Sequence, residues 1–241
     1  MISPLRTIEC SLGLGAITNS MWVSPRLSAI KGDTEGGTIY GTTQNGGDGY
    51  GLVWKYNTAN GEMATVYTFA GGSDGATPLG GVIGPFPTNV EGSEYYLLGT
   101  TSAGGGSANC TGGCGTVVII YLPILSSPPP TDAILHAFQG PDGVAPMSGL
   151  AMIGSGAWGT TESGGGSANC GGYGCGTLFE IQITGITYHK LTFVSLYNFQ
   201  GGAADGAFPS TGLAGDSAGN VLGMAEIGGT GNDGVLFEYV P

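Results

Sequence analysis

Short apolar segments separated by glycine-rich stretches return along this chain in a fixed order. The clearest marker is an apolar pair followed by a glycine and two threonines, or a close variant of that pattern. Its glycines are Gly41, Gly99, Gly159 and Gly223, which lie 58, 60 and 64 residues apart. Because the apolar segments are short and none keeps a helical period, the pattern predicts an all-β protein built from tandem repeats.

Three further markers complete the repeat. A Pro-x-x-Gly turn with an apolar residue predicts a first strand at 25–29, 78–82, 146–150 and 209–213, with Ser28 replacing the glycine in the first copy. A glycine, then any residue, then two apolar residues predict a third strand at 51–54, 115–118, 176–179 and 234–237. A segment ending in phenylalanine predicts a fourth strand at 66–69, 135–138 and 196–199. Four short strands per repeat are typical of a β-propeller blade.

The fourth strand occurs only three times, whereas a segment with no other place in the pattern, Ile8 to Ile17, precedes the first repeat. We therefore predict one repeat domain over residues 1–241, a small propeller of about four four-stranded blades. Its blades are at approximately 25–69, 78–138, 146–199 and 209–240 plus 8–17, with Ile8 to Ile17 pairing beside Leu236 to Val240. The alternatives are an open arc of a larger propeller and a β-sandwich or solenoid.

Composition supports a folded, turn-rich β protein, because 41% of the residues are hydrophobic although the chain holds 50 glycines and 13 prolines. Five Lys and Arg against seventeen Asp and Glu give a formal charge of -12, and no basic cluster offers itself to phosphates, so we expect no nucleic-acid partner. The longest apolar run, 117–125, includes a proline and is shorter than the roughly 20 residues of a membrane helix, so we expect no membrane insertion.

The glycine–threonine and glycine-rich units at 40–47, 98–106 and 176–180 resemble the GloVer-type tandem repeat of bacterial surface proteins. The turn at 215–220 is similar to that repeat as well, and the resemblance covers roughly Pro25 to Tyr239. It implies an exported, often surface-anchored protein of undefined activity, and it transfers no catalytic residue. We therefore expect an extracellular or cell-surface location, although Glu9 interrupts the apolar start that a secretory signal requires and no sorting tail is recognisable.

A binding site is predicted at one end of the sheets. In an antiparallel meander, the loop between the second and third strands and the turn between the fourth strand and the next repeat share one end. This end would gather acidic and aromatic residues suited to a glycan or another polar ligand. The candidate ligand-binding residues are Asp48, Asp74, Asp142, Asp205, Glu162, Glu226, Tyr50 and Tyr173.

The three Asp-Gly-x-x-Pro turns, which contain Asp74, Asp142 and Asp205, allow two interpretations. Carboxylate oxygens suit a hard cation such as calcium, which makes these residues a weak candidate for a calcium site. The alternative is turn chemistry, in which each aspartate accepts hydrogen bonds from its own backbone and the glycine supplies a positive φ. Because the dense aspartate ladder of a calcium loop is missing, the sequence favours turn chemistry and predicts no cofactor.

Two of the loops are longer than the others and share the sequence Gly-Gly-Gly-Ser-Ala-Asn-Cys. Each returns to a second cysteine, which predicts one disulfide from Cys110 to Cys114 and another from Cys170 to Cys175. A zinc site shared by the four thiolates is the alternative, but its spacings are looser than usual. Cys10 is left over, and a buried free thiol is the ordinary expectation for it.

Features that would support an enzyme are scarce. His136 and His189 are the only histidines, and the glycine runs lack the lysine of a phosphate loop. The leading hypothesis is therefore an extracellular module whose acidic, disulfide-braced face binds a glycan or another surface component. The alternatives are a structural or adhesin repeat without a pocket, and a carbohydrate-active hydrolase or lyase with two carboxylates on that face.

Overall fold

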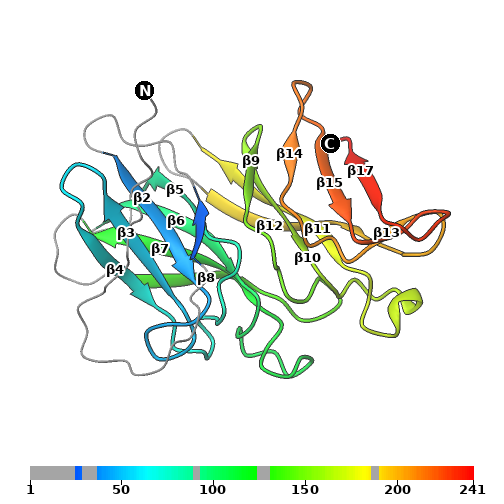
Figure 1. Ribbon diagram of the computed structural model, residues 1–241, viewed down its shortest axis with the longest axis horizontal. Coiled ribbons are helices and arrows are strands. Elements are labelled where there is room, and N and C mark those ends of the chain that lie inside the picture. The colour runs from blue at the N-terminus through cyan, green and yellow to red at the C-terminus, as the bar shows by residue number, and fades with distance from the viewer. Residues whose placement is uncertain (1–24, 29–36, 89–92, 124–130, 186–189) are drawn as a thin grey trace, which may run out of the picture.

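The repeats fold into small antiparallel sheets, each made of strands that follow one another in sequence (Figure 1). The computed structural model describes residues 25–28, 37–88, 93–123, 131–185 and 190–241. Within these ranges the only helix is the 3-10 turn η1 (Ala168–Cys170). The prediction of an all-β fold is confirmed.

Three sheets have four strands and one has three. Sheet 1 contains β1 (Pro25–Ser28), β2 (Thr38–Thr43), β3 (Leu52–Asn57) and β4 (Met63–Thr68). Sheet 2 contains β5 (Val82–Pro87), β6 (Ser93–Thr101), β7 (Thr116–Pro123) and β8 (Thr131–Ala137). Sheet 3 contains β9 (Ala151–Ile153), β10 (Gly156–Thr161), β11 (Thr177–Thr184) and β12 (Lys190–Asn198). Sheet 4 contains β14 (Ala214–Gly215), β15 (Val221–Ala225) and β17 (Val235–Tyr239).

Two very short strands, β13 (Gly206–Ala207) and β16 (Ile227–Gly228), pair outside these four sheets. Equivalent single bridges, Ala76 with Ala103 and Val144 with Ser163, occur in the preceding repeats. The sequence did not predict this pairing. The first strands of sheets 2, 3 and 4 also differ from the prediction. They begin at or just after the end of the Pro-x-x-Gly marker, and the marker itself forms a turn.

Successive sheets pack face to face through side chains that alternate along the strands. In β7, Val117 and Ile119 face the core shared with sheet 3, whereas Val118 and Ile120 face the core shared with sheet 1. This alternation follows from the two-residue period of a strand. Sheet 2 is therefore apolar on both faces, which explains why its central strands read as continuous hydrophobic runs.

A large side chain on the third strand fills the space over the glycine of the glycine–threonine marker. The pairs are Trp54 over Gly41, Phe179 over Gly159 and Phe237 over Gly223. A Cβ on these glycines would lie 2.2, 2.4 and 2.3 Å from a ring carbon of the partner. Because so short a distance is excluded, the glycine opposite the aromatic residue in sheets 1, 3 and 4 is a packing requirement.

The second threonine of the marker forms a hydroxyl pair across to the third strand in sheets 2 and 3. Thr101 bonds Thr116 and Thr161 bonds Thr177, each with an oxygen–oxygen distance of 2.8 Å. In sheet 1 the residue opposite Thr43 is Leu52, and the buried Thr43 hydroxyl has no hydrogen-bond partner. A threonine at the second marker position is therefore hydrogen-bonded to a threonine on the third strand in sheets 2 and 3, and this pair is missing in sheet 1.

The described strands form a row of sheets and do not close into a ring. Sheet 2 lies between sheets 1 and 3, and sheet 4 follows at the far end, where β17 is an edge strand (Figure 1). The predicted pairing of Ile8 to Ile17 with Leu236 to Val240 lies outside the described residues and stays a prediction. The fourth sheet accordingly shows three strands where the blade pattern has four.

Tyrosine ionisation makes the stability of this fold decrease with pH in the alkaline range. Burial, as the largest cause, raises the pKa of Tyr67, Tyr96, Tyr121 and Tyr197, and nearby Asp132 and Asp74 raise that of Tyr67 further. Because the folded pKa exceeds the unfolded value of about 10, this stabilisation is complete below about pH 10 and is lost as the pH rises above it. We expect the urea midpoint, followed by circular dichroism, to fall above that pH, and to fall less in Tyr96→Phe. A midpoint unchanged to about pH 11.5 would contradict this expectation.

Candidate functional site

The end of the sheets predicted to hold a site is a cross-bonded surface, which we call the loop face. It consists of the loops between second and third strands (44–51, 102–115, 162–176 and 226–234) and the turns between repeats (70–81, 139–149 and 200–213). In each turn, the residue before the proline donates its N–H to the loop of its own repeat and accepts from the loop of the next. The Thr77 N–H donates to the Tyr50 carbonyl, and the Thr77 carbonyl accepts from the Ser102 N–H. The equivalent acceptor and donor are Cys114 and Glu162 for Ala145, and Cys175 and Glu226 for Phe208.

These three residues before proline adopt a left-handed backbone, with φ of 59° at Thr77, 53° at Ala145 and 58° at Phe208. Such a conformation is unfavourable for residues with a side chain, and a β-branched threonine is an especially rare occupant. It persists at all three turns because the two backbone hydrogen bonds hold it in place. The loop face is therefore a built feature of each junction between repeats.

The three turn aspartates each accept hydrogen bonds from their own turn. Asp74 accepts from the Ala70 N–H at 2.7 Å, Asp142 from the Gln139 N–H at 2.7 Å, and Asp205 from the Gln200 N–H at 2.7 Å. This geometry is the turn chemistry that the sequence favoured. A calcium ion at any one of them would compete with these bonds.

Each of these aspartates also contacts a ring on the fourth strand, two residues before the phenylalanine that follows the strand. The Tyr67 hydroxyl donates to Asp74 at 3.1 Å, the Tyr197 hydroxyl donates to Asp205 at 2.9 Å, and His136 Nε2 lies 2.6 Å from Asp142. The Tyr197 pKa is raised, mainly by burial and then by Asp205. The aspartates therefore tie each turn to the strand that leads into it.

The two long loops are closed by disulfides, from Cys110 to Cys114 and from Cys170 to Cys175. The second cysteine of each pair is completely buried, whereas the first is half-buried. The residue before the first cysteine fastens the loop to the neighbouring turn: Asn109 donates to the Gln139 carbonyl at 2.6 Å and Asn169 to the Gln200 carbonyl at 2.8 Å. Both loops are thus anchored at one end and presented outward at the other.

The other predicted ligand-binding residues are spread along the loop face. Tyr50 and Tyr173 are 45% and 80% exposed, and Asp48 is exposed in the first loop. Glu226 accepts a hydrogen bond from the Ser210 hydroxyl, and Glu162 is half-exposed. They occupy different repeats, and none of them lines the hollow along β12 at Ser195 to Gln200 or the hollow beside Lys55 and Glu62. Within that structure, no three His, Cys, Asp or Glu side chains gather as metal ligands do.

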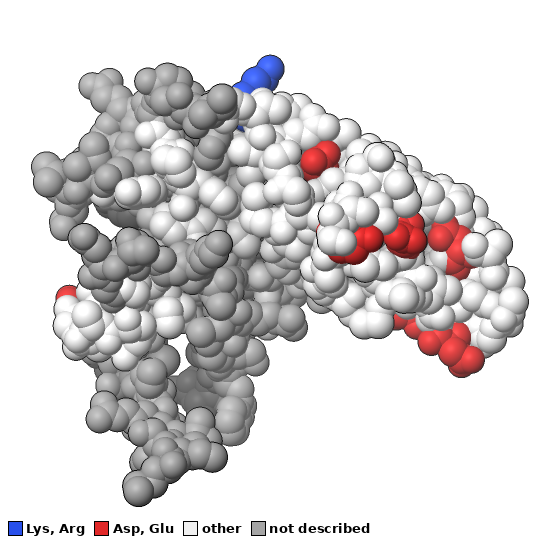
Figure 2. Space-filling model, turned by 90° about the horizontal axis from the view of Figure 1, so that it is seen from above, with Lys and Arg blue, Asp and Glu red and all other residues white. Residues whose placement is uncertain are grey.

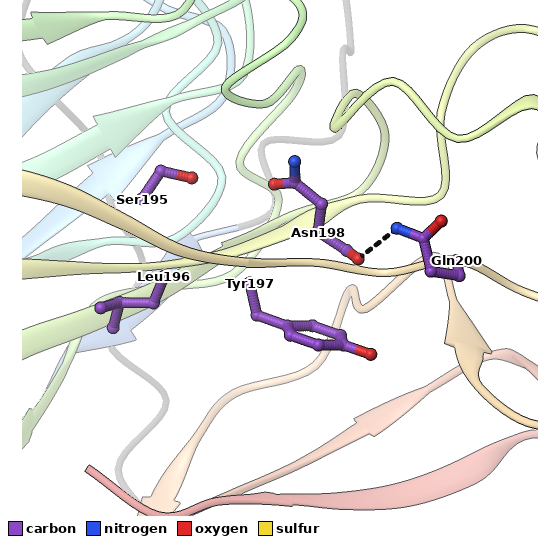
Figure 3. Close-up of a pocket in the computed structure, with 5 residues that line it drawn as sticks. All are labelled: Ser195, Leu196, Tyr197, Asn198 and Gln200. Atoms are coloured by element: carbon purple, nitrogen blue, oxygen red, sulfur yellow. Dashed lines mark hydrogen bonds between the residues drawn. The ribbon is translucent and has the colours of Figure 1, made fainter.

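One hollow lies where the sequence predicted no site. It has a volume of about 380 Å³ and follows β12 toward the loop face, lined by Ser195, Leu196, Tyr197, Asn198 and Gln200 (Figure 3). A β-bulge in β12 places Leu196 opposite no residue of β11, so Leu196 and Tyr197 point to the same side of the strand (Figure 3). The same bulge occurs in β4 at Val66 and in β8 at Leu135.

A sequence signal for the bulge exists. An apolar residue directly before the Tyr or His, with phenylalanine two positions later, breaks the strand alternation in all three fourth strands. The hollow itself arises from tertiary arrangement and has no such local signal.

Acidic side chains gather at the end of the molecule that holds sheet 4 (Figure 2). Exposed members in this part of the chain are Asp216, Glu226, Asp233 and Glu238. Hydrogen bonds from the Asn220 and Ala218 backbone N–H groups lower the pKa of Asp216, which keeps that carboxylate charged. This end of the protein thus carries concentrated negative charge.

No protein-family model matches the chain, and a comparison with curated proteins finds no match. The resemblance to the GloVer-type repeat therefore stays a prediction. In the described part of the chain no helix is long and apolar enough to cross a membrane.

Proposed function

We propose that this protein is an extracellular binding module that holds a glycan or another cell-surface component on its loop face. The observation that carries the proposal is the pair of neighbouring long loops, each closed by a disulfide and fastened to the adjacent turn through Asn109 or Asn169. Rigid loops bind with a smaller entropy loss than mobile ones. The second loop presents Tyr173, 80% exposed, whose ring suits stacking on a sugar.

The disulfides support an extracellular or cell-surface location, because such bonds persist in oxidising compartments. Propeller-like stacking of the repeats belongs to the same proposal. It is supported by the face-to-face packing of successive sheets and by the meander order of their strands. Membership of the GloVer-type repeat group would give this architecture an exported, surface-associated setting.

A structural or adhesin repeat is the second candidate, and a specific observation favours it. The carboxylates of Asp74, Asp142 and Asp205 are already bonded within their turns, so the repeated acidic positions serve the junctions between repeats. A repeat selected for shape and protease resistance needs these bonds and needs no ligand.

A glycan-array screen of the full, oxidised chain, with calcium and with chelator, separates the two candidates. We expect binding that weakens about tenfold, or about 1.4 kcal/mol, in Tyr173→Ala, because this substitution removes the exposed ring that suits stacking on a sugar. Met152→Ala, at another exposed position on sheet 3, is the matched control and should bind normally. A chelator-sensitive signal would assign calcium to the face.

If the well-folded chain binds no glycan in either condition, or binds equally well after Tyr173→Ala and after Asp48→Ala, the loop face is not the site. The structural candidate then stands, because its bonds between turns and loops are independent of any ligand.

A further inference from the structure

The two long loops and the turns beside them present the same side-chain amides twice, at successive junctions between repeats. Asn109 of the first long loop lies against Gln139 of the following turn, and Asn169 of the second long loop lies against Gln200 of the next turn. All four residues are exposed. A ligand on the loop face therefore meets the same chemical groups at two places that are one repeat apart, which we call the two amide pairs.

The glutamine side chains are not needed to anchor the loops. Each asparagine donates to the main-chain carbonyl of the glutamine, so a residue of any type could accept this bond. The first turn lies beside a short loop and has Ala70 at the equivalent position, directly after Phe69. Glutamine therefore accompanies a long loop at both junctions, although the anchoring bond does not require its side chain.

The amide pairs retain hydrogen-bonding capacity. Gln139 Nε2 donates one bond to the Ala137 carbonyl at 3.0 Å, and Gln200 Nε2 donates one to the Asn198 carbonyl at 2.8 Å (Figure 3). A side-chain amide has a second N–H and a carbonyl oxygen that can accept two bonds. No residue in the described part of the chain donates to any of the four side-chain oxygens. Each junction thus offers both donors and acceptors to a ligand.

The charge of the loop face limits the kind of glycan that fits it. Its loops and turns contain seven Asp and Glu residues and no Lys, Arg or His. A carboxylate or sulfate on a glycan would therefore meet negative potential and find no cation to pair with. A cationic group would find the carboxylates next to the amide pairs, those of Asp142 and Asp205, already bonded within their turns. Sugar hydroxyls donate and accept as the amides do, so an uncharged glycan matches this surface.

We propose that the loop face binds an uncharged glycan of repeating units, which spans both amide pairs. This inference rests on the glycan-binding function proposed above and names the class of glycan. One unit of the chain bonds the first amide pair, and a later unit bonds the second pair beside Tyr173. Because sheets stacked face to face lie about 10 Å apart, a single sugar ring is too short to reach both pairs. A longer chain reaches both, and its second contact then forms at a high effective concentration.

The test uses a glycan array that holds uncharged glycans, their uronic acid counterparts and a length series of each, such as oligomers of glucose and of glucuronic acid. The full, oxidised chain is applied to it. We expect the bound glycans to be uncharged and their affinity to rise at least about tenfold with length, as the second amide pair becomes reachable. The acidic counterpart of each bound glycan should bind at least about tenfold more weakly.

Substitutions at the two turns test the amide pairs themselves. Gln139→Ala and Gln200→Ala should each weaken binding of the long glycan about fivefold, through loss of hydrogen bonds. Both variants should stay folded, because alanine already occupies this position in the first turn, at Ala70. Gln182→Ala, at an exposed glutamine of β11 outside the loop face, is the matched control and should bind normally.

A folded chain that binds no glycan on the array would overturn both this inference and the proposed function. Three other results would overturn the inference alone and leave the proposed function standing. The first is an acidic or amine-bearing glycan that binds as tightly as its uncharged counterpart. The second is an affinity that does not change with the length of the glycan. The third is binding that Tyr173→Ala weakens but that neither Gln139→Ala nor Gln200→Ala changes.

Discussion

Replacing Gly176 by alanine is expected to lower the free energy of unfolding by about 3 kcal/mol. Gly176 has a φ of 98°, and a Cβ there would lie 2.6 Å from Pro209 Cδ and 2.5 Å from the Thr161 carbonyl oxygen. Both neighbours are backbone or ring atoms that cannot rotate away. Positive φ costs an L-residue roughly 1–2 kcal/mol and overpacking typically adds 1–3 kcal/mol. Urea unfolding followed by circular dichroism measures the sum.

Gly172 provides the matched control in the same loop. Its φ is 83°, but a Cβ there would meet nothing within 4 Å. Gly172→Ala should therefore cost only the backbone term, roughly 1 kcal/mol. If the two variants lose equal stability, the close approach of the next repeat's proline is not what requires glycine at the start of β11.

Replacing Phe179 by alanine is expected to lower the free energy of unfolding by about 3–5 kcal/mol. Phe179 is 0% exposed and lies in the core between sheets 2 and 3, where its ring also fills the space over Gly159. Removing the ring leaves a cavity walled by two sheets that are joined along their loop face and cannot easily collapse. The equivalent residue of sheet 4, Phe237, is partly exposed, so Phe237→Ala should cost about half as much. Equal losses would show that the two junctions are packed alike.

The second, third and fourth strands of the repeats and their order could be predicted from the sequence because their signals are local. The glycines of three markers, Gly41, Gly159 and Gly223, are required by the aromatic side chain opposite each, and the markers recur at nearly constant spacing. The turn aspartates were predictable for the same reason, since Asp142 bonds a backbone group only three residues away. The two disulfides follow from cysteines four and five positions apart.

The left-handed residues before proline could not be predicted, because the local rule points elsewhere. A residue before proline normally takes an extended conformation, and nothing in Thr77 or Phe208 favours a positive φ. Their conformation depends on hydrogen bonds to loops of two repeats, which are tertiary contacts. The hollow beside Tyr197 escaped prediction for a related reason, since it depends on which neighbour each fourth strand has.

The predicted binding residues show what the alternation of connections between the two ends of the sheets can predict and what it cannot. Alternation of connections correctly brings the turns and the long loops to one end of the sheets, as the bond from Ala145 to Cys114 shows. It does not determine where side chains point or whether their polar atoms are already used. Asp205 illustrates the difference, because its carboxylate accepts from Tyr197, Gln200 and Gly206 within its own repeat.

Face-to-face stacking of successive repeats is the central claim, and a double-mutant cycle on Phe138 and Phe179 tests it most directly. These rings belong to neighbouring repeats, and their centroids lie 5.5 Å apart in an edge-to-face arrangement. Stacked sheets predict that the two alanine substitutions are not additive, with a coupling energy of about 0.5–1.5 kcal/mol. Additive losses in a chain that unfolds in one transition would show that the two repeats do not share a core.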